Sequence, residues 1–127
     1  MSVFDQINPR SATPLYAQIA ARIRGAIAAG ELAPGDGLPS VRHLAGRLLI
    51  NPATVVQAYR ELESEGFVEM RQGAGTFVRD VPARKKDTER QQQIVGLARR
   101  VLAEAGKERV TAAELIAALQ KLTGGNR

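Results

Sequence analysis

Apolar residues recur every four positions near the start of the chain, at Leu15, Ile19, Ile23 and Ile27. This spacing places them on one face of an α-helix of about four turns. Thr13 in front of Pro14 predicts an N-cap residue followed by proline at the first helical position, and Gly30 is the expected C-terminal stop. The pattern therefore predicts an amphipathic helix over about residues 14–29.

Residues 31–39 contain the turn pairs Pro34-Gly35 and Asp36-Gly37, so we expect a compact loop there. Leu32 and Leu38 are expected to tuck from this loop into the core. Ser40 is the expected cap of a second helix that ends near Leu49. Its predicted inner face consists of Val41, Leu44, Ala45 and Leu48.

Asn51 followed by Pro52 gives the same start signal for a third helix, which Gly66 is expected to end. Its predicted inner face consists of Val55, Ala58, Tyr59 and Leu62. Only Ile50 and Asn51 separate this helix from the second one, and so short a gap holds two helices at a steep angle, as in a helix-turn-helix.

Two β-prone runs, residues 67–71 and 76–79, surround the glycine-rich turn Gln72-Gly73-Ala74-Gly75 and predict a β-hairpin. A hairpin after a helix-turn-helix is the wing of a winged helix. The predicted fold class is therefore α+β, with a winged helix-turn-helix of three helices and a two-stranded hairpin over residues 1–80. A linker over residues 81–87 and a two-helix region over residues 88–127 are expected to follow.

The last two predicted helices each carry an apolar stripe. The first, about residues 88–105, has Ile94, Leu97, Ala98, Val101 and Leu102 on one face. The second begins with a capping box at Thr111 and Glu114 and is expected to bury Leu115, Ile116, Leu119 and Leu122. Since a single helical hairpin cannot hide both stripes, we expect a homodimer through Ile94, Leu97, Val101, Leu115, Ile116 and Leu119. The alternative is that the stripes pack on the chain's own first helix.

The charge distribution selects no partner by itself. The chain of 127 residues has a net charge of +5, but residues 1–80 contain eight basic and eight acidic side chains. The whole excess lies in residues 81–127, with ten basic and five acidic side chains, and includes the run Arg84-Lys85-Lys86. A pI of about 10.2 therefore supports an anionic partner only weakly.

The composition provides few of the side chains that enzymes use for catalysis. With no cysteine and one histidine, His43, the chain can form neither thiolate metal sites nor clusters of several histidines. Gly73-Ala74-Gly75 is followed by a strand pattern and not by a helix, so it is not a nucleotide-binding loop. No apolar run approaches the roughly 20 residues that span a bilayer. We expect a soluble cytoplasmic protein that is not an enzyme, needs no cofactor or metal and does not associate with membranes.

The outer face of the third helix is the candidate binding surface. In a winged helix this face enters the DNA major groove while the hairpin lies along the adjoining backbone or minor groove. Asn51 and Thr54 could bond a phosphate or a base edge, and Gln57 could read adenine. Because Glu61, Glu63 and Glu65 make the end of this face acidic, only its first turn is expected to face phosphates. Asn51 and Thr54 could also serve only as helix caps.

Seven ordered segments of the chain resemble the N-terminal domain of the GntR family of bacterial transcription regulators. They are residues 14–19, 30–36, 38–45, 51–55, 58–62, 65–66 and 73–78. The short C-terminal part is similar to that of the YtrA-type subfamily. This resemblance implies a repressor that binds an inverted-repeat operator as a homodimer, often at operons for ABC transporters.

The resemblance also implies DNA contacts at Arg42, Asn51, Thr54, Gln72 and Gly73. Many relatives have arginine where this chain has Pro52 and Val56, so base readout here would depend on Gln57, Arg60 and the wing. The candidate DNA-binding residues are Ser40, Arg42, Asn51, Ala53, Thr54, Gln57, Arg60, Arg71, Gln72, Gly73 and Gly75. The alternative function is a winged-helix module that binds other proteins and not DNA. The sequence identifies no effector ligand.

Overall fold

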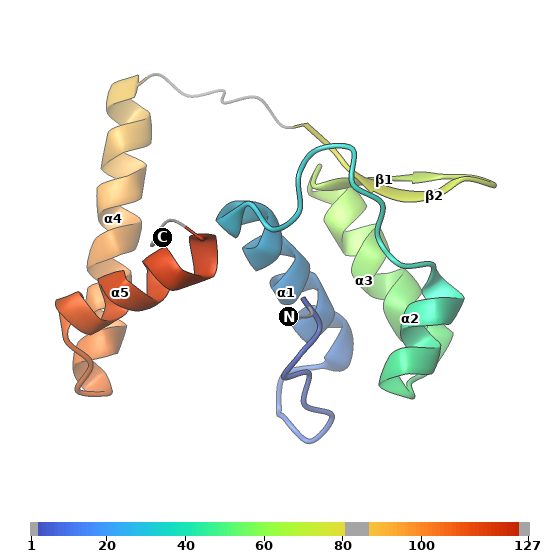
Figure 1. Ribbon diagram of the computed structural model, residues 1–127, viewed down its shortest axis with the longest axis horizontal. Coiled ribbons are helices and arrows are strands. Elements are labelled where there is room, and N and C mark those ends of the chain that lie inside the picture. The colour runs from blue at the N-terminus through green and yellow to red at the C-terminus, as the bar shows by residue number, and fades with distance from the viewer. Residues whose placement is uncertain (1–2, 81–86, 125–127) are drawn as a thin grey trace. The chain divides into compact units, whose positions relative to one another are not determined.

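The computed structural model describes residues 3–80 and 87–124, and the chain divides into two compact units, Met1–Val81 and Pro82–Arg127. The first unit contains the helices α1 (Leu15–Ala29), α2 (Val41–Leu48) and α3 (Pro52–Ser64) and the strands β1 (Val68–Arg71) and β2 (Gly75–Val78). The second contains α4 (Asp87–Lys107) and α5 (Ala112–Thr123) (Figure 1). This order confirms the predicted α+β winged helix-turn-helix followed by two helices. The predicted linker lies outside the described residues except for Asp87, where α4 begins.

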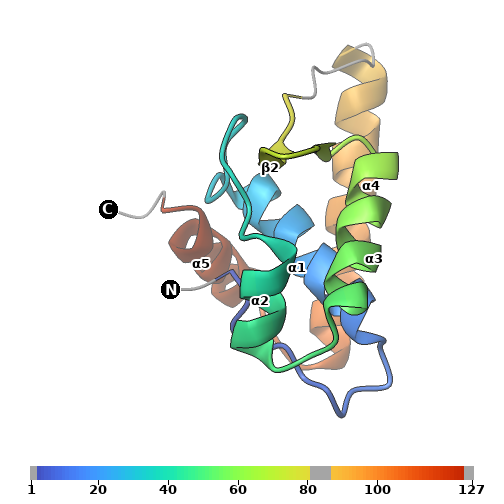
Figure 2. The same ribbon diagram turned by 90° about the vertical axis from the view of Figure 1, so that its right-hand side faces the viewer.

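The third helix is the centre of the first unit, because it packs against α1, α2 and β1 (Figures 1 and 2). Its predicted inner face is fully buried, which confirms Val55, Ala58, Tyr59 and Leu62 as core residues. These side chains meet Ile19 and Ile23 of α1, Leu44 and Ala45 of α2, and Val68 and Val78 of the hairpin in one hydrophobic cluster. The cluster fixes the orientation of the opposite, outer side of α3.

Two of the three helix caps predicted in the first unit are present. The Ser40 hydroxyl accepts a hydrogen bond from His43 N, and Asn51 Oδ1 accepts one from Ala53 N. The prediction for α1 is wrong, because Pro14 itself occupies the cap position and no side chain caps this helix. The Gln18 side chain lies there instead and donates to the carbonyl oxygens of Asn8 and Thr13, both at 2.8 Å. Thr13 thus serves as an acceptor for a glutamine one turn into the helix.

The wing is bonded along both edges of its second strand. On one edge β2 pairs antiparallel with β1, with Val68 opposite Val78 and Arg71 opposite Gly75. On the other edge the loop before α2 pairs with it, since Gly35 N donates to Val78 O at 2.8 Å and Leu38 N donates to Thr76 O at 2.8 Å. The sequence predicted a compact loop with Leu38 in the core, which is confirmed, but gave no indication of this pairing.

The second unit is a helical hairpin with its apolar side chains exposed. The capping box is confirmed, since Thr111 and Glu114 bond each other's backbone N–H, and the hydrogen bond from the Thr111 backbone lowers the pKa of Glu114. Within the single chain, however, the predicted interior residues of α5 are not buried. Ile116, Leu119 and Leu122 remain 50–54% exposed. In the described ranges no helix is both long and apolar enough to cross a membrane.

Candidate nucleic-acid interface

The outer side of α3 presents one exposed stripe. Ala53, Gln57 and Arg60 are spaced four and three residues apart, so they share a helix face, and all three are exposed. In the described part of the chain the side chains of Gln57 and Arg60 form no hydrogen bond or ion pair. Both are therefore free to donate to an external acceptor.

The carboxylates that follow this stripe are bonded away from it, which corrects the prediction of an acidic outer face. Arg24 of α1 binds Glu61 through Nη2 at 2.8 Å and Glu65 through Nε at 2.9 Å. Glu63 accepts a hydrogen bond from the backbone N–H of Met70 in β1 at 2.8 Å. The hydrogen bond with Glu65 raises the pKa of Arg24, so its guanidinium keeps the positive charge that holds the two carboxylates. The carboxylates are thus held at the flanks of α3, against α1 and β1.

The first turn of α3 combines a helix cap with a free side-chain amide donor. Asn51 Oδ1 is occupied by the bond from Ala53 N, so its capping role is established, while the side-chain NH₂ group of Asn51 remains available. Thr54 is half-buried, and its backbone N–H bonds to Asn51 O. Because the N-terminus of a helix carries partial positive charge, this turn favours an anion.

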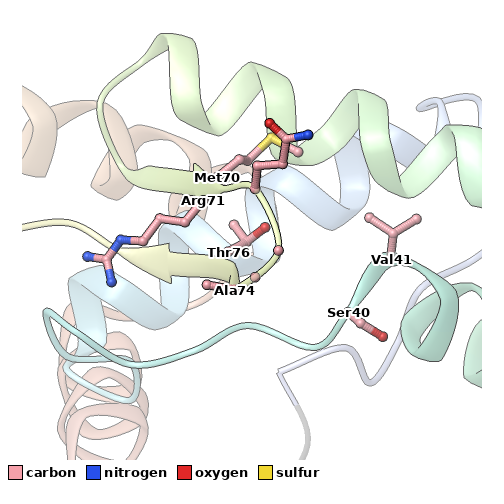
Figure 3. Close-up of a pocket in the computed structure, with 9 residues that line it drawn as sticks. Ser40, Val41, Met70, Arg71, Ala74 and Thr76 are labelled. Carbon is pink, nitrogen blue, oxygen red and sulfur yellow. The ribbon is translucent and has the colours of Figure 1, made fainter.

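A shallow hollow of about 570 Å³ lies between the start of α2 and the hairpin turn. It brings Ser40 and Val41 together with the wing segment from Met70 to Thr76 (Figure 3). The structure therefore unites Ser40 with the four predicted wing residues, Arg71, Gln72, Gly73 and Gly75. Residues of α3 do not line this hollow. Arg42 is exposed on the first turn of α2, and its side chain has no partner in the described part of the chain.

The wing holds Arg71 in a fixed position. Its Nε donates to Glu69 Oε1 at 2.8 Å, and its guanidinium carbon lies 4.5 Å from the centre of the Phe77 ring. In Figure 3 the side chain runs back along the hairpin, away from the turn. The remaining guanidinium N–H groups stay accessible at a side chain that is 55% exposed. Sequence reasoning missed Glu69 and Phe77, although both follow from the hairpin register, which places them opposite each other beside Arg71.

The turn of the wing depends on backbone conformations that glycine favours. Gly73 has φ +79° and Gly75 has φ +122°, which L side chains rarely adopt. A Cβ atom at Gly75 would lie 3.7 Å from the Phe77 ring, an ordinary contact, so the conformation and not the space requires glycine. Both glycines of the predicted turn therefore adopt a backbone conformation that other residues would adopt only with strain.

The start of α2 is fastened to α3 by a buried tyrosine. The Tyr59 hydroxyl donates to the Pro39 carbonyl oxygen at 2.7 Å, one residue before the Ser40 cap. Burial raises the pKa of Tyr59, so its hydroxyl keeps the proton that this bond requires. The sequence placed Tyr59 in the core as an apolar residue and gave no signal for its polar partner.

Comparison with known proteins places this arrangement among bacterial regulators. Residues 15–78 match the family described as bacterial regulatory proteins, gntR family. The HTH-type transcriptional repressor YtrA of Bacillus subtilis is 49% identical over 73 residues, which cover 58% of this chain and 56% of that protein. The HTH-type transcriptional regulator Rv1152 of Mycobacterium tuberculosis is 42% identical over 73 residues, which cover 58% of this chain and 60% of that protein. The match thus spans little more than half the length of these relatives.

Two solved structures resemble this chain in fold as well as in sequence. YtrA from Sulfolobus acidocaldarius, a GntR-family transcription factor, superposes with a TM-score of 0.59 at 38% identity and covers 80% of this chain and 99% of its own. The DNA-binding domain of AraR in complex with operator ORX1 superposes with a TM-score of 0.51 at 32% identity, covering 56% of this chain and 88% of its own.

Proposed function

Because the chain belongs to the GntR family of bacterial regulatory proteins, we propose that it is a sequence-specific DNA-binding transcription repressor of the short, YtrA-like kind. The family consists of regulators, in agreement with the prediction that the chain is not an enzyme. The names of its relatives support repression, and the operator complex of AraR supports DNA as the partner. The proposal covers the whole protein and not only the matched domain.

The observation that carries this proposal is the acid-free stripe on α3. In the proposed complex the first turns of α3 enter the major groove, where Gln57 bonds an adenine edge and Arg60 a guanine edge or phosphate. The start of α3, with Asn51, Ala53 and Thr54, approaches the sugar–phosphate backbone. The neighbouring backbone is held by the cap residue Ser40, by Arg42 of α2 and by the wing residues Arg71, Gln72, Gly73 and Gly75. All of these except Arg42 line the hollow.

A gel-shift titration against the promoter of the protein's own operon tests this assignment. We expect a sequence-dependent complex, and Arg60→Ala should weaken it by about 1–3 kcal/mol. Arg10→Ala is the matched control, because Arg10 is also exposed but lies outside α2, α3 and the wing. Equal binding of the promoter and a scrambled duplex would favour the alternative, a winged-helix module for protein partners.

The second unit supports a homodimer as the functional form. Ile94, Leu97 and Val101 of α4 are 46%, 54% and 38% exposed in the single chain, and Ile116 and Leu119 of α5 are 54% and 50% exposed. Leu115 is partly buried beside them. Exposed apolar surface on this scale marks an interaction site. A second copy supplies the matching apolar face, and a two-fold axis then sets two α3 helices about 34 Å apart on an inverted-repeat operator.

Sedimentation of full-length variants tests the dimer. Leu97→Glu combined with Leu119→Glu should yield a monomer, because each substitution buries a charge in the proposed interface. Gln92→Glu introduces the same charge at an exposed polar position of α4 and should leave the dimer intact. The monomeric variant should bind an inverted repeat about 10²–10⁴-fold more weakly, since each half-site is then occupied independently. A dimer that survives both substitutions would place the interface elsewhere.

We propose operons for ABC transporters as the targets, on the resemblance to YtrA-type regulators alone. A reporter fused to a transporter operon beside the gene should rise in expression when the protein is deleted. A fall in expression would identify an activator.

A further inference from the structure

Arg24 makes an unusual double contact with α3. Its Nη2 and Nε bind Glu61 and Glu65 at 2.8 and 2.9 Å, and Nη2 also lies 3.3 Å from the second carboxylate oxygen of Glu65. The two glutamates are one helical turn apart, on the flank of α3 that faces α1. One guanidinium therefore holds two carboxylates of the DNA-reading helix.

Helix packing does not require this contact. The interface between α1 and α3 is built by fully buried apolar side chains, among them Ile19, Ile23, Val55 and Leu62. The side chains of the ion pairs are 32–40% exposed, and ion pairs so open to water contribute little to folding stability. Folding stability therefore does not explain why Arg24 bonds the two glutamates.

The position of Glu61 supplies that explanation. Glu61 lies four residues after Gln57, so the two side chains are neighbours along the surface of α3. A carboxylate that is not held elsewhere can accept a hydrogen bond from the Gln57 amide, the donor group that adenine recognition uses. It would also place a negative charge near the DNA backbone.

We propose that Arg24 is a positioning residue for DNA recognition, which withholds the Glu61 and Glu65 carboxylates from Gln57 and from the phosphates. This inference rests on the proposed DNA-binding function. It assigns a role in binding to a side chain on α1, a helix that contributes none of the predicted contact residues. It also explains how three glutamates can follow the reading face of α3 without opposing its function, because Glu63 is held separately by Met70 N.

The size of the effect follows from screened electrostatics. A carboxylate and a phosphate about 10 Å apart in water change a binding constant about twofold, and added salt reduces this effect. With two or three phosphates in range and competition for Gln57, Arg24→Gln should weaken binding about three- to tenfold at about 50 mM salt, and less than about twofold at about 300 mM.

The experiment uses the full-length protein and a duplex that the wild-type protein selects from a randomised pool. Three variants are compared with the wild type over a range of salt concentrations. Arg24→Gln releases the carboxylates, and Arg24→Gln combined with Glu61→Gln and Glu65→Gln releases only neutral amides. Arg22→Gln is the matched control, because Arg22 also lies on α1 but bonds the Gln6 amide oxygen at 3.0 Å and, among residues 3–80 and 87–124, no carboxylate. Thermal unfolding confirms that every variant is folded.

We expect Arg24→Gln to bind more weakly than Arg22→Gln, and the triple variant to regain at least wild-type affinity. Equal losses for Arg24→Gln and Arg22→Gln would reduce the effect to net charge and overturn the inference. A triple variant as weak as Arg24→Gln would overturn it as well, since the contact would then be structural. If the wild-type protein selects no duplex, the proposed function falls together with the inference. If the wild type binds and Arg24→Gln binds equally well, only the inference falls.

Discussion

Replacing Tyr59 by phenylalanine removes one oxygen atom from the centre of the winged domain. The ring is fully buried in the core cluster, and phenylalanine fills the same space. The lost hydroxyl donates to Pro39 O at 2.7 Å, the residue directly before the cap of α2. Tyr59→Phe therefore separates the contribution of this hydrogen bond from that of the packing around it.

The bond is partly buried, so its loss also leaves the Pro39 carbonyl poorly solvated. A net hydrogen bond is worth about 0.5–1.5 kcal/mol, and an unsatisfied buried acceptor costs about 1–3 kcal/mol. Since water reaches part of this site, we expect the free energy of unfolding to fall by about 1–2 kcal/mol. Affinity for DNA should fall as well, because the start of α2 and the loop that pairs with β2 lose their fastening to α3.

The same group gives the stability a pH dependence. Burial raises the pKa of Tyr59 in the folded chain above the ordinary value of 10. The folded state then keeps a proton that the unfolded state loses, so the free energy of unfolding falls as pH rises above about 10. For a single tyrosine this loss reaches about 0.8 kcal/mol at about pH 10.5. Tyr59→Phe lacks the titrating group, and its deficit relative to the wild type should shrink by that amount.

Urea unfolding followed by circular dichroism, at about pH 8 and about pH 10.5 and at one protein concentration, measures both effects. Tyr16→Phe is the control, because Tyr16 packs against the same core and its hydroxyl forms no hydrogen bond within the described residues. Its stability should stay within about 0.5 kcal/mol of the wild type. Equal stability of Tyr59→Phe and Tyr16→Phe at about pH 8 would refute the role assigned to the Tyr59 bond.

Three further substitutions test single features of the winged domain. Arg42→Ala should weaken operator binding by about 1–3 kcal/mol with unfolding unchanged, and an unaltered Kd at matched salt would remove Arg42 from the site. Gly75→Val should abolish most of the binding in gel shifts, because φ is +122° there, whereas Ala74→Val in the same turn should bind nearly as the parent does. Leu49→Gly should raise the free energy of unfolding by up to about 1 kcal/mol in thermal melts, since Leu49 has φ +57° and is 90% exposed. A destabilised Leu49→Gly would show that the exposed side chain has a contact that offsets its strain.

Local patterns in the sequence determined the order of helices and strands and most of the core. These patterns involve residues that are close together in the chain. They are the four-residue spacing in α1, the capping residues Ser40 and Asn51, and the glycines of the wing turn. Each signal needs only neighbouring residues to be read, which is why the winged helix could be predicted. The resemblance to a family then extended the same local matches to a function and to candidate contacts.

The tertiary structure alone decided the partners of the polar groups. Arg24 bonds residues 37 and 41 positions away, and Tyr59 bonds a carbonyl 20 positions away. Any of eight acidic side chains in residues 1–80 could have been the partner of Arg24, and periodicity does not distinguish among them. The positions of Glu61, Glu63 and Glu65 along the chain therefore predicted an acidic end for the outer face of α3, whereas in the structure these carboxylates are bonded to Arg24 of α1 and to the backbone of β1. That packing decides which donors remain free for DNA. Such partners are set by distances in space and not by spacing along the chain, so the sequence alone could not identify them.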